Sequence, residues 1–416
     1  MLFVFIGIIV IIATIYFLIK NVESRLVLIA AGLLMATIAG SPMAAFDAFS
    51  ERMVAGSLIQ AILSVMGFAF VMKVTECDKH LIRLVGGGVT KLGPLLIPGA
   101  VMATFFINIA LPSAAGAAAA VGAVFIPLLI SVGVHPAVAG AAVLAGTYGS
   151  MLSPGLSHNS FIAEIANMDV LDVIATHSTA SIVSGFIGAI SLAVVAYIFK
   201  ENKGYSSAEF QIDKDFKVNY IAALVPLVPV VLLVLGNTVV PAFKMGIPQA
   251  MLIGIIVAMI VTRKNVQTLT KSFFDGMGKA YGDIMGIIIA ASVFVGGLEA
   301  IGLVDQFIDS MIHTPAIVNI AATFGPFLLG VVSGSGDAAA FAFNEAVTPF
   351  AEQFGISIEN MGSIAALGGA LGRTMSPIAG ACVVCAGIAK VNPMELAKRN
   401  APGMIIAAVV SMFILL

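Results

Sequence analysis

Two polar interruptions in the second half of the chain carry side chains that could bind an anion. SGSGD (333–337) places two serines and an aspartate in apolar surroundings, and GRTMSP (372–377) adds an arginine, a threonine and a serine. Hydroxyls and a guanidinium hydrogen-bond carboxylates, while an aspartate can carry a proton or help to bind a cation. The candidates for substrate contact are Ser333, Ser335, Arg373, Thr374 and Ser376, and the candidate for ion coupling is Asp337.

The first half has two similar interruptions. LPSAAG (111–116) and SPGLSHN (153–159) also break apolar runs. They supply Ser113, Ser157, His158 and Asn159 as candidates for substrate contact, and Ser153, with Asn344 from the second half, for the coupling ion. Each candidate also has a structural interpretation: Arg373 could cap a helix, Asp337 could be an N-cap, Asn344 could pack between helices, and a serine can repair a broken backbone ladder.

The composition identifies the class of protein that must position these residues. Hydrophobic residues make up 60% of the chain and charged residues 10%, against about 25% charged in a soluble domain. The chain is therefore an integral membrane protein, made of helices. The apolar stretch from Leu2 to Ile19 has no basic residue before it, which predicts a retained first span rather than a signal peptide. Three cysteines provide no disulfide framework.

Irregular backbone survives at membrane depth only where protein or water surrounds it. The four breaks therefore predict two re-entrant hairpins and two broken helices. We expect about ten transmembrane helices in two halves, separated by a charged cytoplasmic linker at 200–217, with a short polar loop near Asp47–Arg52. The first half (1–199) has scaffold spans at 2–75, an amphipathic arm at 76–92, a hairpin at 93–130, a broken helix at 136–168 and a span at 179–199; the second (218–416) has the same order at 220–301, 302–313, 315–350, 357–390 and 402–416.

The two halves repeat each other in sequence. LPSAAGAAAA (111–120) corresponds to VSGSGDAAAF (332–341), and Ser153-Pro154 corresponds to Ser376-Pro377, with an offset between about 221 and 223 residues. Such internal repetition is typical of secondary transporters. Five spans per half would make the repeats inverted. Treating each hairpin as two full spans would give fourteen crossings, and charge counting does not distinguish the two models.

The basic residues predict the orientation. In this threading seventeen lysines and arginines fall on one side, and only Arg52 and Lys244 on the other. The positive-inside rule then places both termini outward and the linker in the cytoplasm.

These motifs resemble those of a known family. The order of elements is similar to that of the ion transporter superfamily, and four segments resemble the anaerobic C4-dicarboxylate transporter (DcuC) family: 67–85, 125–134, SGSGDAAAF (333–341) and LGRTMSPIAGACVVCAGIAKVNP (371–393). The resemblance implies an elevator-type secondary transporter in the bacterial cytoplasmic (inner) membrane, usually a homodimer. This chain has Asp337 where the family pattern has asparagine.

The expected function is secondary active transport of small organic anions, most of all C4-dicarboxylates of the succinate, fumarate and malate type, driven by Na+, by H+ or by exchange. Helix N-termini near Gly116, Asn159, Asp337 and Ala381 would attract the anion. The alternatives are a cation/proton antiporter and a carrier of monocarboxylates or other organic anions. We expect no enzyme, because no HExxH or GxSxG motif occurs in a suitable context. We also expect no cofactor, no bound metal and no nucleic-acid partner, with Na+ as a candidate coupling ion.

Overall fold

The computed structural model describes residues 2–20, 22–89, 92–205, 216–304, 306 and 315–416, and the elements it assigns within them are all helical. The chain opens with α1 (Leu2–Ile19), α2 (Ser24–Ile38), α3 (Pro42–Arg52) and α4 (Gly56–Thr75). The prediction of a polar loop near Asp47–Arg52 is wrong, because these residues lie in α3. Pro42 begins that helix, and proline is favoured at the first position because it needs no hydrogen-bond partner there.

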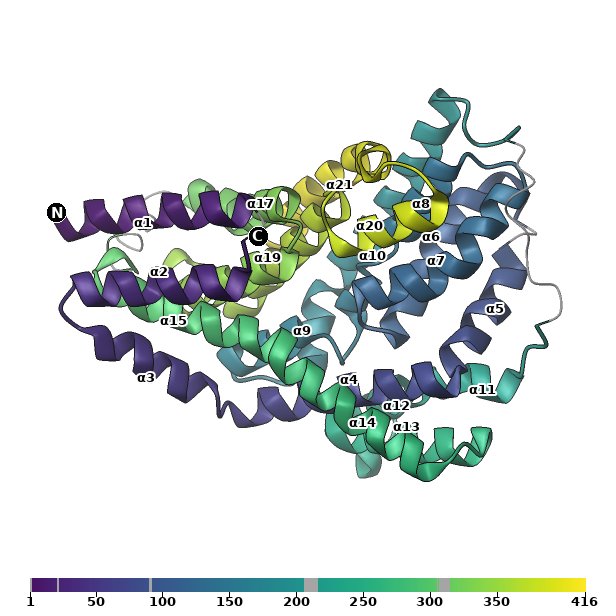
Figure 1. Ribbon diagram of the computed structural model, residues 1–416, viewed down its shortest axis with the longest axis horizontal. Coiled ribbons are helices and arrows are strands. Elements are labelled where there is room, and N and C mark those ends of the chain that lie inside the picture. Colours follow the sequence, from purple (N-terminus) through teal and green to yellow (C-terminus); the bar gives the residue numbers. More distant parts are fainter. Residues whose placement is uncertain (1, 21, 90–91, 206–215, 305, 307–314) are drawn as a thin grey trace.

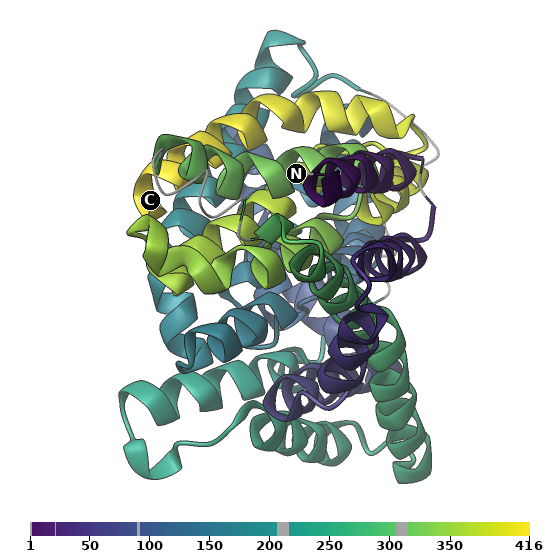
Figure 2. The same ribbon diagram turned by 90° about the vertical axis from the view of Figure 1, so that its left-hand side faces the viewer.

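One layer of the molecule combines the first helices with the start of the second half. It contains α11 (Tyr220–Leu224), α12 (Val228–Thr238), α13 (Ile247–Thr262), α14 (Val266–Ala280) and α15 (Gly286–Ala300). A short π-helix at Tyr281–Met285 joins α14 to α15 in one long rod, drawn in green in Figure 1. The rod packs on α2 and α3 through α15, and on α4 through α14. Figure 2 shows teal α11–α13 and the far end of this rod on one side of the molecule.

Glycines bring α2 and α15 into backbone contact. A Cβ on Gly32 would overlap the carbonyl oxygen of Val293, and one on Gly297 would overlap the carbonyl oxygen of Gly32. Small residues permit such close approach between membrane helices. This pair therefore forms a firm support for the elements packed on it.

The amphipathic arms are described unequally. Helix α5 (Cys77–Val89) covers most of the first arm, with Leu81 and Ile82 buried. Most of the second arm, 302–313, lies outside the described residues, as does 206–215 of the linker.

Two helical hairpins follow the same design. The first joins α6 (Leu96–Ala110) to α7 (Ala114–Ser131), and the second joins α17 (Pro315–Ser333) to α18 (Gly336–Ala346). At each tip a serine caps the second helix: Ser113 Oγ accepts from the Gly116 amide at 3.2 Å, and Ser335 Oγ accepts from the Ala338 amide at 3.4 Å. Positions 113 and 335 are 222 residues apart, within the offset expected from the sequence.

Two broken helices also match. The first consists of α8 (Pro136–Ala145), a 3-10 turn at Gly149–Leu152 and α9 (Ser157–Ala166), and the second of α19 (Ile358–Thr374) and α20 (Gly380–Ala389). They end at the left-handed residues Asn167 (φ 51°) and Lys390 (φ 55°). The following helices are α10 (Val170–Ile198) and α21 (Pro393–Leu415). Both begin about nine residues before the spans expected at 179–199 and 402–416.

The half-helices cross between the repeats. Helix α20 packs on α7 and α8 of the first half, while α9 packs on α19 and α18 of the second. Yellow α20 beside the blue helices in Figure 1 shows this exchange. Glycines repeat the same close approaches: a Cβ on Gly149 would overlap the carbonyl oxygen of Phe105, and one on Gly372 would overlap that of Phe327. Because α9 and α20 each pack on the opposite half, both breaks lie at the junction of the two halves.

Six helical segments among the described residues are long and apolar enough to cross a membrane. They are Leu58–Thr75, Gly93–Ala110, Ala114–Ser131, Val170–Ile198, Val266–Ala300 and Pro393–Leu415. Two of the six are the arms of the first hairpin, so length alone does not separate a hairpin arm from a full span. Six further apolar helices are 10–17 residues long, and the count of ten spans stays a prediction.

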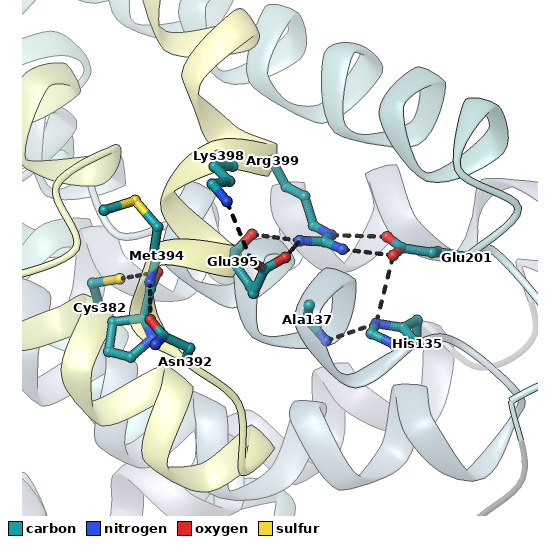
Figure 3. Close-up of polar contacts among 10 residues, drawn as sticks. His135, Ala137, Glu201, Cys382, Asn392, Met394, Glu395, Lys398 and Arg399 are labelled. Carbon is teal, nitrogen blue, oxygen red and sulfur yellow. Dashed lines mark hydrogen bonds and ion pairs between the residues drawn. The ribbon is translucent and has the colours of Figure 1, made fainter.

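The start of the linker is fixed to the last helix (Figure 3). Arg399 of α21 donates to both carboxylate oxygens of Glu201, at 2.8 and 2.5 Å, and to the Glu395 carboxylate at 2.8 Å. The backbone amide of His135 donates to the Glu201 carbonyl oxygen at 2.9 Å. These bonds connect the linker to α21 and to the first turn of α8.

Candidate functional site

The two halves of the chain meet at His158 and Asp337. His158 lies in the first turn of α9, and its Nε2 is 3.1 Å from Oδ1 of Asp337 in the first turn of α18. The His158 ring stacks on Phe341, with ring centroids 4.0 Å apart. The His158 side chain is 4% exposed, whereas the Asp337 side chain is 63% exposed. The buried imidazole is therefore held by its contact with Phe341, while the Asp337 carboxylate is exposed.

Arg373 makes a second connection between the halves. It lies in the last turn of α19, and its guanidinium donates to the Thr147 carbonyl oxygen at 3.1 Å and to the Thr147 hydroxyl at 3.5 Å. Thr147 follows the C-terminal end of α8, where carbonyl oxygens lack helical partners. The guanidinium thus contacts the C-terminal end of α8 in the opposite half.

Several candidate hydroxyls hold the irregular backbone. Ser333 Oγ donates to the Leu329 carbonyl oxygen at 2.6 Å, and Thr374 Oγ1 donates to the Ala370 carbonyl oxygen at 2.8 Å. Ser153 Oγ accepts from the Gly155 amide at 3.2 Å. The Ser376 hydroxyl is buried without a hydrogen-bond partner among the described residues. Of these four, Ser376 therefore retains the most capacity for a ligand.

Two candidate asparagines are buried braces. Asn159 donates to the carbonyl oxygens of Met151 (2.8 Å) and Ser153 (2.9 Å), and its Oδ1 contacts Nε2 of His177 at 3.1 Å. Asn344 donates to the Gly362 carbonyl oxygen at 3.2 Å and accepts from Thr348 Oγ1 at 2.9 Å. Both are 0% exposed. Asn159 therefore braces the first break, and Asn344 braces α18 against α19.

Two cavities adjoin the tip of the first hairpin. A small cavity of about 30 Å³ brings Ser113 and Ser157 together, with Pro112 and Gly155 in its wall. A larger cavity of about 770 Å³ also reaches Ser113 and is lined by Lys73, Glu76, Asp78, Lys79 and Arg83. The charged cavity lies at the end of α4 and along α5, on the predicted cytoplasmic side. It gives the first tip a polar approach from that side.

Sequence reasoning missed several residues that shape this region. Asn108 of α6 donates to the Leu111 carbonyl oxygen at 2.8 Å and accepts from the Ser150 amide at 2.8 Å, so it joins the first tip to the first break. Thr147, His177 and Phe341 were also missed. The available signals were Asn108, a single amide side chain in a mostly apolar helix, and His177, a histidine in another such helix. Nothing in the sequence marks Thr147 as the partner of Arg373, because that contact depends on the crossing of the repeats.

Comparison with solved structures supports the architecture. MtrF of Neisseria gonorrhoeae superposes with a TM-score of 0.64 at 14% identity, covering 88% of this chain and 82% of that one. The YdaH transporter of Alcanivorax borkumensis superposes with a TM-score of 0.60 at 14% identity, covering 89% and 86%. At this identity the likeness shows the fold alone, which is that of helical membrane transporters.

Sequence comparison shows the family. An uncharacterized transporter of Haemophilus influenzae is 47% identical over 270 residues, which are 62% of this chain and 97% of that protein. The anaerobic C4-dicarboxylate transporter DcuC of Escherichia coli K12 is 24% identical over 376 residues, covering 85% of this chain and 79% of that protein. The family model for DcuC, the C4-dicarboxylate anaerobic carrier, matches residues 2–416. The resemblance expected from the motifs is thus confirmed, and the chain belongs to the DcuC family of membrane transporters.

Proposed function

We propose that the protein is a secondary active carrier of C4-dicarboxylates whose substrate binds where the two hairpin tips and the two breaks converge. The observation that carries this proposal is the pair of contacts between the halves, from His158 to Asp337 and from Arg373 to Thr147. A dianion needs cationic and N–H donors at membrane depth. The convergence of the breaks supplies Arg373 and the N-termini of α7, α9, α18 and α20.

The binding groups differ between the two halves. On the first-half side we assign Ser113, Ser157 and His158, and on the second-half side Ser333, Ser335, Arg373, Thr374 and Ser376. Asn159 shapes the first break. One carboxylate of the substrate binds near Arg373, because a guanidinium can donate two parallel hydrogen bonds. The buried Ser376 hydroxyl completes that end of the site.

The transport mechanism in this proposal is an elevator. The repeats are inverted, both termini face outward in the inner membrane, and the layer of α1–α4 and α11–α15 is the scaffold. Matched positions support the duplication: caps at 113 and 335, left-handed ends at 167 and 390, and close glycines at 149 and 372. The hairpins and broken helices move against the scaffold as one body, and the carrier assembles as a homodimer.

Asp337 is the proposed coupling group, and His158 contacts its carboxylate. Ser153 holds the backbone of the first break, and Asn344 joins α18 to α19. An exposed carboxylate can carry a proton when it is protonated, and we propose H+ rather than Na+ as the coupling ion. The same exposed carboxylate keeps cation/proton exchange as the second candidate function. Imposing proton and sodium gradients separately on proteoliposomes discriminates the two, since the antiporter would move cations without any dicarboxylate.

The substrate class can be tested by measuring how ligands change the thermal stability of the protein. A ligand that binds only the folded protein at about 100 times its Kd stabilises it by roughly 2.7 kcal/mol. Succinate, fumarate or malate should therefore raise the Tm of the detergent-purified protein, and acetate should not. Equal stabilisation by acetate and succinate would contradict a site built for two carboxylates.

A further inference from the structure

Arg52 is the centre of a second polar cluster, away from the proposed substrate groups. It ends α3, and its guanidinium donates to Glu164 Oε1 at 2.7 Å, to Glu345 Oε2 at 2.5 Å and to the Ser292 hydroxyl at 3.1 Å. Ser292 in turn donates to Glu345 Oε1 at 2.8 Å. The Arg52 and Glu345 side chains are each 15% exposed. One arginine thus ties together four helices: α3, α9, α15 and α18.

Two of these helices are the ones that carry His158 and Asp337. Glu164 lies on α9 with His158, and Glu345 lies on α18 with Asp337. The two helices are therefore bridged twice, at one end by the His158–Asp337 contact and at the other by Arg52.

Aromatic rings fill the space between the two bridges. The Arg52 guanidinium lies 5.0 Å from the centroid of Phe161, which meets Phe341 edge-on at 5.3 Å. Phe341 stacks on His158. An unbroken series of contacts therefore runs from Arg52 to Asp337.

The other two helices belong to the proposed scaffold. Helix α15 packs on α2 and α3, and α2 and α15 are in backbone contact through Gly32 and Gly297. The bonds of Arg52 to Glu164 and Glu345 thus join the substrate-bearing helices to this support. A cavity of about 590 Å³ beside the cluster is also lined by Asp47, Glu51 and Glu299. Removing Arg52 would leave Glu164 and Glu345 facing each other in acidic surroundings, where they would repel.

We infer that Arg52 is a positioning residue that clamps α9 and α18 to each other and to the scaffold. This inference rests on the proposed function for its role in transport: when the two helices move against α3 and α15, the bonds of Arg52 to Glu164 and Glu345 must break. The clamp therefore helps to set the fraction of time that the carrier spends in the conformation described here.

Cysteine accessibility tests the clamp without any substrate. Ala342 of α18 packs against a cluster that includes Ile288 and Ile289 of α15, so Ala342→Cys reports separation of these helices. The three native cysteines are buried, and the parent without Ala342→Cys gives the background. Arg52→Gln should raise the rate of labelling at position 342 by a water-soluble maleimide at least about tenfold, the factor for 1.4 kcal/mol. Lys244→Gln, an exposed cation on the same predicted side, should leave the rate unchanged.

Companion variants keep the test decisive. Adding Glu345→Gln to Arg52→Gln removes the repulsion and should bring labelling back towards the parent rate. If Arg52→Gln does not fold, Glu345→Gln alone removes one bond of the clamp and should give a smaller increase. Equal labelling rates in the parent, Arg52→Gln and Glu345→Gln proteins would overturn the clamp. Faster labelling in a protein that moves no dicarboxylate would support the clamp while contradicting the proposed function.

Discussion

The imidazole of His158, from the first half of the chain, contacts the carboxylate of Asp337, from the second half, at 3.1 Å. Neither residue has its partner in its own repeat, and their sequence separation is 179 residues. The crossing of α9 into the second half creates the contact. In the proposed mechanism, this contact between the repeats is where ion coupling and movement of the repeats meet.

Replacing Asp337 by asparagine should uncouple transport. The amide keeps the shape of the side chain but cannot exchange a proton, so dicarboxylate exchange should persist while gradient-driven accumulation falls to the level of equilibration. Accumulation ratios in proteoliposomes with an imposed proton gradient measure this. Asp275→Asn, on the exposed face of α14, serves as the control. Full accumulation by Asp337→Asn would show that Asp337 is not the coupling group.

Replacing Arg373 by lysine should weaken substrate binding. Lysine keeps the charge but lacks the planar fork that donates two parallel hydrogen bonds. We expect KM for succinate to rise by about tenfold or more, the equivalent of a lost charged hydrogen bond of roughly 1.5–3 kcal/mol. Initial-rate kinetics measure the change, with Arg25→Lys as the surface control. An unchanged KM would rule out substrate contact by Arg373.

Replacing Gly372 by alanine should destabilise the protein. The new Cβ would overlap the Phe327 carbonyl oxygen, and such overpacking typically costs about 1–3 kcal/mol. Gly387→Ala is the matched control, because nothing lies within 4 Å of its Cβ position and alanine favours a helix by about 1 kcal/mol over glycine. Thermal unfolding in detergent should therefore lower the Tm for the first variant and leave it equal or higher for the second. A Gly372→Ala protein as stable as the parent would contradict the close packing of α17 on α19.

Replacing Arg399 by glutamine should destabilise the linker anchor. The Arg399 side chain is 8% exposed and pairs with Glu201, and breaking a buried pair typically costs about 3–5 kcal/mol. Lys398 is 64% exposed and lies 3.5 Å from Glu395. Because such a surface pair contributes little, Lys398→Gln should lower the free energy of unfolding by about 0–1 kcal/mol. The two variants differ by one position in the chain, and their Tm values give the comparison. Similar losses for both would show that the Glu201–Arg399 pair contributes no more than a surface contact.

Local chemistry in the sequence was enough to locate the hairpin tips and the breaks. Ser113 and Ser335 cap the second helix of each hairpin, and Ser-Pro at 153 and 376 interrupts the apolar runs, because these residues cap or break the backbone ladder. These signals act over a few residues, so the breaks in the structure fall where the sequence predicts them. The starts of α10 and α21 were placed too late, because Asp169 and Asn392 cap helices whose first two turns contain charged residues, which hydropathy alone excludes from a span.

Contacts between the halves could not be predicted in the same way. The bonds from Arg373 to Thr147 and from Arg52 to Glu164 and Glu345 join residues more than a hundred positions apart. They depend on how α9 and α20 cross into the opposite half. The positive-inside rule predicts that Arg52 is one of two outward cations, but a single sequence does not show that three helices place their polar groups around it.

Uptake into proteoliposomes is the most direct test of the central claim. Purified protein would be reconstituted and given labelled succinate under a proton gradient and a sodium gradient applied separately, with protein-free liposomes as the blank. The account predicts saturable succinate uptake that unlabelled fumarate and malate inhibit and acetate does not, stimulated by the proton gradient. The absence of succinate, fumarate and malate transport under every gradient would contradict it.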